Sequence, residues 1–165
     1  MFHIKRKFPT YLVDDKGVSP ITASKIAGGE ESWIAAWPTR VAIVHEAKIQ
    51  HMFEWYEIET AAWDETKRIF TMTFVDSQQE PIEIQFALDA NDSLLTMIHE
   101  RVERSIVCQG FAELPSGGTA RGQVRRRADE SLFVQLIVDK QPSGEDLKEI
   151  GRLEAELRDL VGLDE

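Results

Sequence analysis

The chain of 165 residues contains a single cysteine, Cys108, and no long uninterrupted apolar run. One cysteine cannot form an intrachain disulfide, which fits a reducing compartment and predicts a cytoplasmic protein. No window approaches the roughly 18 consecutive apolar residues that indicate a membrane-spanning helix. The N-terminal cations Lys5, Arg6 and Lys7 precede no apolar segment, so we expect no secretory signal.

The sequence also lacks the motifs that mark common enzymes. Gly28-Gly29 and Gly117-Gly118 do not belong to a phosphate-binding glycine pattern, and no G-x-S-x-G elbow is present. The paired carboxylates Asp64-Glu65 fall in an expected hairpin turn, a wet position that suits proton transfer poorly. These absences predict a protein that is not an enzyme and that uses no cofactor.

Positive charge is scarce, since the formal net charge is −10 and most of the excess negative charge lies between residues 51 and 100. An acidic surface repels phosphate groups, which disfavours nucleic acid and anionic lipid as general partners. The apolar content of 42% and charged content of 29% are ordinary for a globular protein, and the length suits one domain.

The clearest pattern that is present predicts an amphipathic helix over Asp89–Cys108. Asp89, Asn91 and Asp92 precede its apolar residues, and each can accept a hydrogen bond from the free N–H groups of a first turn. Its apolar residues recur at helical spacing and form one stripe, which consists of Leu94, Leu95, Ile98, Val102 and Ile106.

Runs of alternating apolar and polar residues predict β-strands on both sides of this helix. The expected strands before it are Trp33–Trp37, Arg40–His45, Glu54–Trp63, Arg68–Val75 and Ile82–Leu88. After it we expect a hairpin of Thr119–Ala128 and Ser131–Asp139, then a helix that Ser143 and Asp146 cap and Gly162 ends. Antiparallel strands in succession with two helices predict an α+β fold.

Four stretches carry a resemblance to a known family: Glu54–Asp64, Phe86–Asp89, Glu100–Val107 and Val124–Arg127. The block Trp55–Ser105 resembles bacterial pleckstrin-homology-like (PH-like) domains, and the wider likeness is to a family of small uncharacterised bacterial proteins. The resemblance implies a strongly bent antiparallel sheet, or partly open barrel, capped by the helix at about 89–108. Lipid-binding members carry a basic motif in the first hairpin, where Trp37–Arg40 offers one cation, so the resemblance implies no lipid binding.

This resemblance also suggests how the chain is divided. Residues 1–31 form an N-terminal arm, an extra strand or a short helix at Ile21–Ala27, and residues 32–110 form the PH-like domain. Residues 111–165 form a C-terminal hairpin and amphipathic helix that extend the standard fold, packed on the same domain.

Two surfaces of that extension are candidates for binding. Arg121, Arg125 and Arg127 share one face of their expected strand, and three guanidinium groups in a row suit an anion or an acidic protein edge. The same row also fits a solvent-exposed face of the sheet whose arginines pair with nearby carboxylates. On the last helix the apolar seam of Ile150, Leu153, Leu157 and Leu160 packs either on the hairpin or on another subunit.

The nearest approach to a metal signature is His99 with Glu103, which lie four residues apart on the first helix. A zincin helix needs a second histidine at that position and a third ligand, and neither His45 nor His51 has a fixed spacing to them. Cys108 lies at the expected C-terminus of that helix, where the helix dipole opposes a reactive thiolate.

The sequence therefore predicts a non-catalytic cytoplasmic module for protein binding or scaffolding that self-associates and has an unidentified partner. A small-ligand or metal-dependent enzyme built on His99 and Glu103 stands as the alternative. Weak binding of anions or anionic lipid by the Arg121–Arg127 strand is a third hypothesis.

Overall fold

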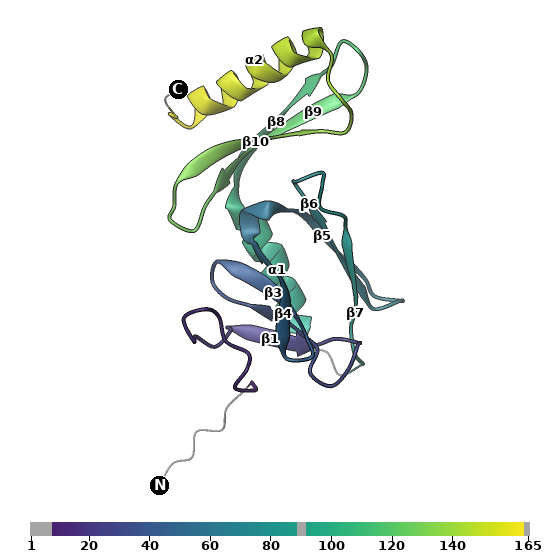
Figure 1. Cartoon of the computed structure of the whole chain (residues 1–165). Helices are drawn as coiled ribbons and strands as arrows, with labels where there is room; N and C mark the ends of the chain where they lie inside the picture. The colour runs from purple at the N-terminus through teal and green to yellow at the C-terminus, as the bar shows by residue number, and fades with distance from the viewer. Residues whose placement is uncertain (1–7, 89–91, 164–165) are drawn as a thin grey trace. The chain divides into compact units, whose positions relative to one another are not determined.

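The computed structural model describes residues 8–88 and 92–163 and has an α+β fold, as the sequence predicts (Figure 1). Three antiparallel sheets, two α-helices and one 3₁₀ helix make up these residues. The chain divides into two compact units, Met1–Arg101 and Val102–Glu165, so the division falls inside the first helix rather than at residue 110.

The first unit opens with a four-stranded antiparallel meander. Its strands follow chain order as β1 (Thr22–Lys25), β2 (Trp33–Ala36), β3 (Arg40–His45) and β4 (Lys48–Glu54). Of the alternatives expected for residues 1–31, the extra strand is present and the short helix at Ile21–Ala27 is not, because β1 occupies this segment and pairs with β2. Upstream of it Leu12 is buried, so the arm from Phe8 onward contributes to the core of the unit.

The interior of β3 explains why this meander forms. Val41–Val44 are all buried, and a short run that is apolar on both faces suits a central strand. A two-residue turn, Glu46-Ala47, then leads into β4, and both residues have positive φ, at 49° and 64°. Positive φ at both central residues is the feature of a type I′ hairpin turn.

A second sheet of three strands follows in the same unit. A short 3₁₀ helix, η1 (Trp55–Glu57), precedes β5 (Ile58–Asp64), β6 (Ile69–Phe74) and β7 (Ile82–Gln85), so the strand expected from Glu54 begins later. Strand β6 has one buried face, since Phe70, Met72 and Phe74 are buried while its alternate residues are not. A single bridge between Ile26 and Phe86 links the segments that follow β1 and β7.

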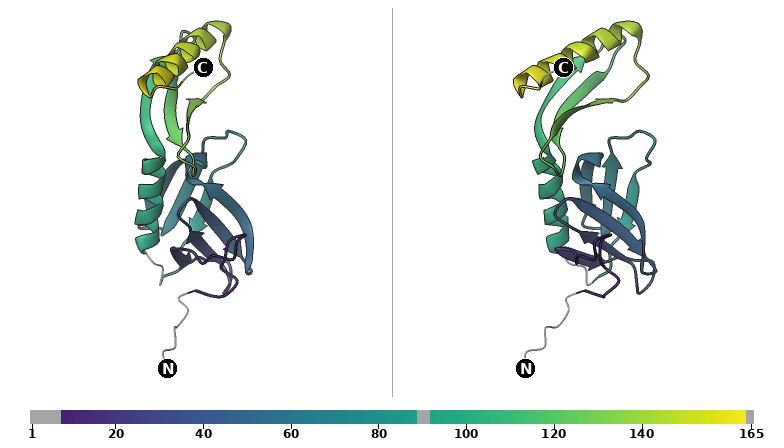
Figure 2. Two further views of the ribbon diagram at one scale, coloured as in Figure 1. Left: turned by 90° about the vertical axis from the view of Figure 1, so that its left-hand side faces the viewer. Right: turned by 60° about the vertical axis from the view of Figure 1, so that its left-hand side comes forward.

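The first helix, α1, spans Asp92–Ser105. Leu94, Ile98 and Val102 of its predicted stripe are buried, and Figure 2 shows the helix beside the strands of the first unit. The predicted end at Cys108 is wrong, because strand β8 begins at Ile106. Ile106 and Val107 are β-branched and favour extended backbone. Because Ile106 also continues the helical spacing of the apolar stripe, that spacing alone does not show where the helix ends. The expected caps Asp89 and Asn91 lie outside the described residues.

The second unit is a three-stranded antiparallel sheet with one helix on it. Its strands are β8 (Ile106–Glu113), β9 (Thr119–Arg126) and β10 (Leu132–Val138), in the order β10-β9-β8. The predicted hairpin is confirmed, since β9 and β10 pair without a register shift from Ala120–Val138 to Arg126–Leu132. Helix α2 (Gly144–Leu160) lies on one face of the sheet (Figure 2).

Two glycines let α2 come close to this sheet. Gly110 of β8 and Gly122 of β9 are cross-strand partners, and both lie under the helix. An added Cβ at Gly122 would stand 2.5 Å from Leu157 Cδ1, and one at Gly110 would stand 3.2 Å from Leu153 Cδ1. Leu153 and Leu157 therefore occupy the space above these two glycines, which a larger residue at either position would fill. Ile150 belongs to the same core.

The start of α2 is fixed by the predicted capping box. Ser143 Oγ accepts from Asp146 N at 3.3 Å, and the Asp146 carboxylate accepts from Ser143 N at 2.9 Å. The same buried carboxylate accepts from the hydroxyl and the backbone N–H of Ser116 in the β8–β9 turn. Donation from the Ser116 hydroxyl and from the Ser143 backbone lowers the pKa of Asp146. Asp146 thus ties the helix to the turn.

Candidate functional site

Alternation along β9 divides the side chains of the second unit between two faces. Ala120, Gly122 and Val124 point toward α2, whereas Arg121, Gln123 and Arg125 point to the opposite face. The predicted common face of Arg121 and Arg125 therefore exists. We call this side of the β8–β10 sheet the arginine face.

Arg125 is not an accessible cation on this face, because it is fully buried. Its Nε and Nη2 atoms both donate to Ser105 Oγ, at 3.1 and 2.5 Å. Its Nη1 donates to the amide oxygens of Gln123 and Gln135, each at 3.3 Å. The guanidinium thus links the end of α1 to β9 and β10, and it acts as a structural centre of the unit.

The other two arginines differ in exposure. Arg127 is exposed, and its guanidinium lies 4.0 Å from the centre of the Phe133 ring while Nη1 donates to Ser131 Oγ at 3.3 Å. Arg121 is half-buried and pairs across the strands with Phe111 and Ile137. The predicted row of three cations is therefore interrupted at its centre, which weakens the case for a binding site for extended anions.

Uncharged residues fill much of the arginine face. Gln109, Gln123 and Gln135 stand opposite one another on β8, β9 and β10, and Gln123 Nε2 donates to Gln109 Oε1 at 3.2 Å. In the next row Phe111 is 63% exposed at the side of β8. An exposed aromatic beside amide groups is typical of protein-binding surfaces rather than of phosphate sites.

The predicted seam of α2 divides between core and surface. Leu153 and Leu157 are buried against the sheet of their own unit, so they belong to its core and are not available to a partner. Leu160 is 71% exposed, and more than half of Leu147 is exposed as well. Helix α2 therefore docks within the chain, and the heptad-like spacing does not form a coiled-coil seam.

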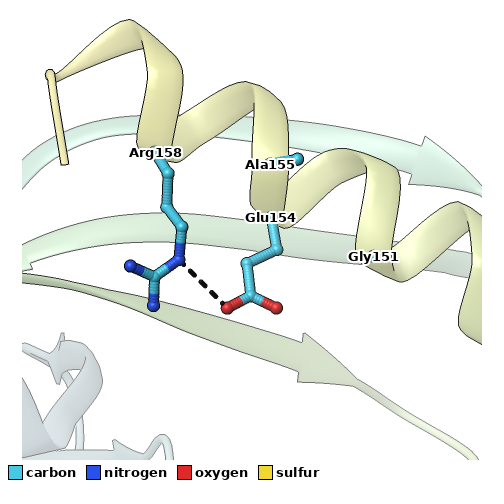
Figure 3. Close-up of a pocket in the computed structure, with 4 residues that line it drawn as sticks. All are labelled: Gly151, Glu154, Ala155 and Arg158. Carbon is cyan, nitrogen blue, oxygen red and sulfur yellow. Dashed lines mark hydrogen bonds and ion pairs between the residues drawn. The ribbon is translucent and has the colours of Figure 1, made fainter. Parts of the chain in front are cut away.

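One side of α2 borders a shallow hollow of about 340 Å³ (Figure 3). Gly151 and Ala155 leave the helix surface low there, and Glu154 accepts from Arg158 Nε at 3.3 Å. Figure 3 shows the Glu154 and Arg158 side chains reaching down from α2 toward the side of the sheet where β10 lies. This side of the helix carries one anion and one cation beside small residues.

The position of strand β10 at the edge of its sheet is a feature that the sequence interpretation missed. All seven residues of β10 are partly exposed. Of the edge strands in the described sheets, β10 alone carries no charged residue. Charges on the other edges are Lys25 in β1, Lys48 and Glu54 in β4, Glu59 and Asp64 in β5, Glu83 in β7 and Glu113 in β8. The signal in the sequence was Leu132–Val138 itself, which has high β propensity and no charge.

The residues considered for metal or thiol chemistry lie apart from these features. His99 and Glu103 are both exposed on α1. Within residues 8–88 and 92–163, no group of three or more His, Cys, Asp and Glu side chains is placed to hold a metal ion. Cys108 is on β8 and packs at the edge of the core under α2, so it does not lie at the C-terminus of α1 as predicted.

A histidine of the first unit does form a defined polar contact. His45 Nδ1 lies 2.9 Å from Ser32 Oγ, which donates to the Gly28 carbonyl at 3.1 Å. Ser32 is buried in the connection between β1 and β2, and His45 ends β3, so this contact holds two turns together. His51 instead stacks on Phe53 of the same strand, with ring centres 5.8 Å apart.

No protein-family model matches the chain, and no curated protein matches it in sequence. Neither helix in the described part of the chain is long and apolar enough to cross a membrane.

Proposed function

We propose that the chain is a non-catalytic protein-binding or scaffolding module that assembles through its second unit. The observation that supports this most directly is β10, an uncharged edge strand beside a flank of α2 that carries Glu154, Arg158 and two small residues. An edge strand presents unpaired N–H and C=O groups, and natural sheets usually protect such an edge with charge, proline or a bulge. An edge without this protection suits the addition of another strand, which is a common mode of protein recognition.

For the first unit we infer a PH-like domain. A four-stranded and a three-stranded antiparallel sheet followed directly by a helix support this inference, because the PH-like fold has about seven antiparallel strands and a helix at one open end. Such folds serve many unrelated functions, so this inference concerns the architecture of the unit and does not identify a ligand. We place the module in the cytoplasm, where a lone thiol such as Cys108 stays reduced.

The third hypothesis, anion or lipid binding by Arg121, Arg125 and Arg127, has less support than protein binding. Arg125 donates to three uncharged side chains and is buried, and Arg127 lies over Phe133. Multiple accessible cations in one patch give affinity for phosphate surfaces, and the described arginine face offers Arg127 alone as an exposed member of the three.

A charge placed on the β10 edge tests the proposal. Gln135→Glu keeps an oxygen acceptor for Arg125 Nη1, so the unit should fold, but it adds a charge to the unprotected edge. Gln50→Glu is the matched control, because Gln50 lies exposed on β4, an edge strand that already carries charge. The tagged full chain and both variants are used to capture proteins from host lysate, and retained proteins are quantified by mass spectrometry.

We expect the wild-type chain and Gln50→Glu to retain the same specific protein, whether self or another chain, and Gln135→Glu to retain at least about tenfold less. Equal retention by all three chains would remove β10 as the binding edge. Retention of no specific protein by the wild-type chain would contradict the proposed function.

A further inference from the structure

The two edges of the second unit differ in a way that indicates where assembly takes place. β8 has a register shift between Ile106 and Cys108 and carries Glu113, and both a bulge and a charge discourage strand addition. β10 pairs with β9 without a shift along its whole length and carries neither protection. The sheet is therefore open to growth at one edge.

We propose that β10 pairs in antiparallel fashion with β10 of a second copy of this chain, about a twofold axis that passes through Gln135. This inference rests on the proposed function and names its partner and register. Twofold interfaces are the commonest in homo-oligomers, and they require a surface that is complementary to itself.

The sequence of β10 meets that requirement. With Gln135 opposite Gln135, Val134 faces Leu136 of the second copy, Phe133 faces Ile137 and Leu132 faces Val138. Every apolar residue then lies opposite an apolar residue, and the Gln135 side chains of the two copies lie opposite each other. Cross-strand pairs of this type each contribute roughly 0.2–1 kcal/mol beyond alanine pairs, so complementarity along the strand decides the register.

The ends of the strand agree with the same register. Glu130 lies in the turn before β10, and Lys140 follows its end by two residues. Glu130 pairs with Arg126 at 3.5 Å. In the antiparallel register centred on Gln135, the end of one β10 that follows Glu130 lies nearest the end of the second copy that precedes Lys140, so residues of opposite charge flank the same end of the interface. A register shifted to a neighbouring axis would set Gln135 against the apolar side chain of Val134 or Leu136 and would lose the amide pair.

The flank of α2 that faces β10 is compatible with this pairing. Directly opposed residues of an antiparallel pair point to the same face, so the register centred on Gln135 sets both α2 helices on one face of a six-stranded sheet. Their flanks then face each other above the joined strands. Glu154 and Arg158 give each flank one anion and one cation, so a twofold axis matches opposite charges, while Gly151 and Ala155 leave room.

Site-specific crosslinking of the full chain tests both the partner and the register. In a Cys108→Ala background, Gln135→Cys sets two thiols directly opposite across the axis. Opposed Cα atoms in antiparallel pairs are about 4.5–5.5 Å apart, and a disulfide spans about 4.4–6.8 Å. The matched control is Ile137→Cys in the same background, whose two thiols would be offset by four residues, about 13 Å at roughly 3.3 Å per residue.

We expect the wild-type chain to have twice the chain mass by light scattering. Gln135→Cys should give a covalent dimer under mild oxidation that reductant reverses, and Ile137→Cys should not. Thermal melts of both variants establish that they fold. The mass of the wild-type chain tests the dimer even if a variant does not fold. A monomeric wild-type chain, or crosslinking at 137 rather than 135, would overturn the inference.

The failure of this inference can be separated from the failure of the proposed function. A monomeric chain that still captures another protein, with capture lost in Gln135→Glu, would overturn self-pairing and leave the binding module standing. A monomeric chain that captures nothing would overturn both.

Discussion

The guanidinium of Arg125 on β9 holds the hydroxyl of Ser105 through two of its nitrogens, and that hydroxyl in turn donates to the Val102 carbonyl at 2.6 Å. All three residues are buried. The last turn of α1 is thus joined to the middle strand of the following sheet by a chain of hydrogen bonds that begins at a charge.

We predict that Ser105→Ala destabilises the protein by about 1.5–3 kcal/mol, the usual contribution of a buried hydrogen bond to a charged group. The substitution removes the acceptor of both Arg125 nitrogens and adds no bulk. Urea unfolding followed by circular dichroism measures the loss. Ser77→Ala, in the exposed turn after β6, is the control and should leave the midpoint unchanged; equal midpoints for Ser105→Ala and wild type would refute the role of the hydroxyl.

A second prediction concerns two glycines of the second unit. Gly122→Ala should cost about 1–3 kcal/mol of stability, because its Cβ would meet Leu157 Cδ1 at 2.5 Å within a filled core. Gly151→Ala should stabilise by about 0.5–1 kcal/mol, since Gly151 lies in the interior of α2 and an added Cβ there meets nothing within 4 Å. Thermal melts of the two variants should shift in opposite directions, and shifts of the same sign would contradict this packing.

A third prediction is a pH dependence from Asp146. The pKa of its carboxyl is lowered in the folded protein, chiefly by the Ser116 hydroxyl and the Ser143 backbone, so the ionised form stabilises the fold. That contribution is complete above the unfolded pKa of about 3.9 and is lost as the pH falls toward the folded value.

The matched variant is Asp146→Asn, which cannot ionise. We expect wild type to be more stable than Asp146→Asn at pH 7 and the difference to shrink steadily between about pH 5 and pH 2. Urea unfolding of both proteins across this range measures it. A difference that stays constant with pH would show that the charge of Asp146 has no part in holding α2 to the β8–β9 turn.

A fourth prediction concerns the β3–β4 turn. Ala47 has φ of 64°, a conformation that costs a residue with a Cβ roughly 1–2 kcal/mol and costs glycine little. Ala47→Gly should therefore raise the free energy of unfolding, by up to about 1 kcal/mol. The reverse change, Gly117→Ala at φ of 100°, should lower it, and a stabilising Gly117→Ala would contradict the assigned turn geometry.

The elements that sequence patterns predicted well are those with an unambiguous local signal. β6 alternates cleanly, and α2 begins at a serine with an aspartate three residues later. β8 was missed because Ile106 continues the helical spacing of α1 by coincidence. β4 was missed because Lys48–His51 are all exposed and only Ile49 among them is apolar, so the strand exists through its pairing with β3 rather than through burial.

The candidate site was harder to predict for a different reason. Alternation placed Arg121 and Arg125 on one face correctly, but no local pattern states which position of a sheet face is buried. Leu157 and Leu160 have the same apolar character, and only the position of Gly122 under the helix distinguishes the buried one. The β10 edge was readable as an uncharged run, yet its meaning depends on the strand order, which is a tertiary property.

The order of the strands also bears on how the chain folds. Each sheet is a meander in which every strand pairs with its neighbour in the chain, joined by short turns. Contacts that are close in sequence close small loops at a low entropic cost and correlate with fast folding. The bridge between Ile26 and Phe86 encloses most of the first unit, so we expect its hydrogen bonds to form last during folding and to exchange their amide protons first.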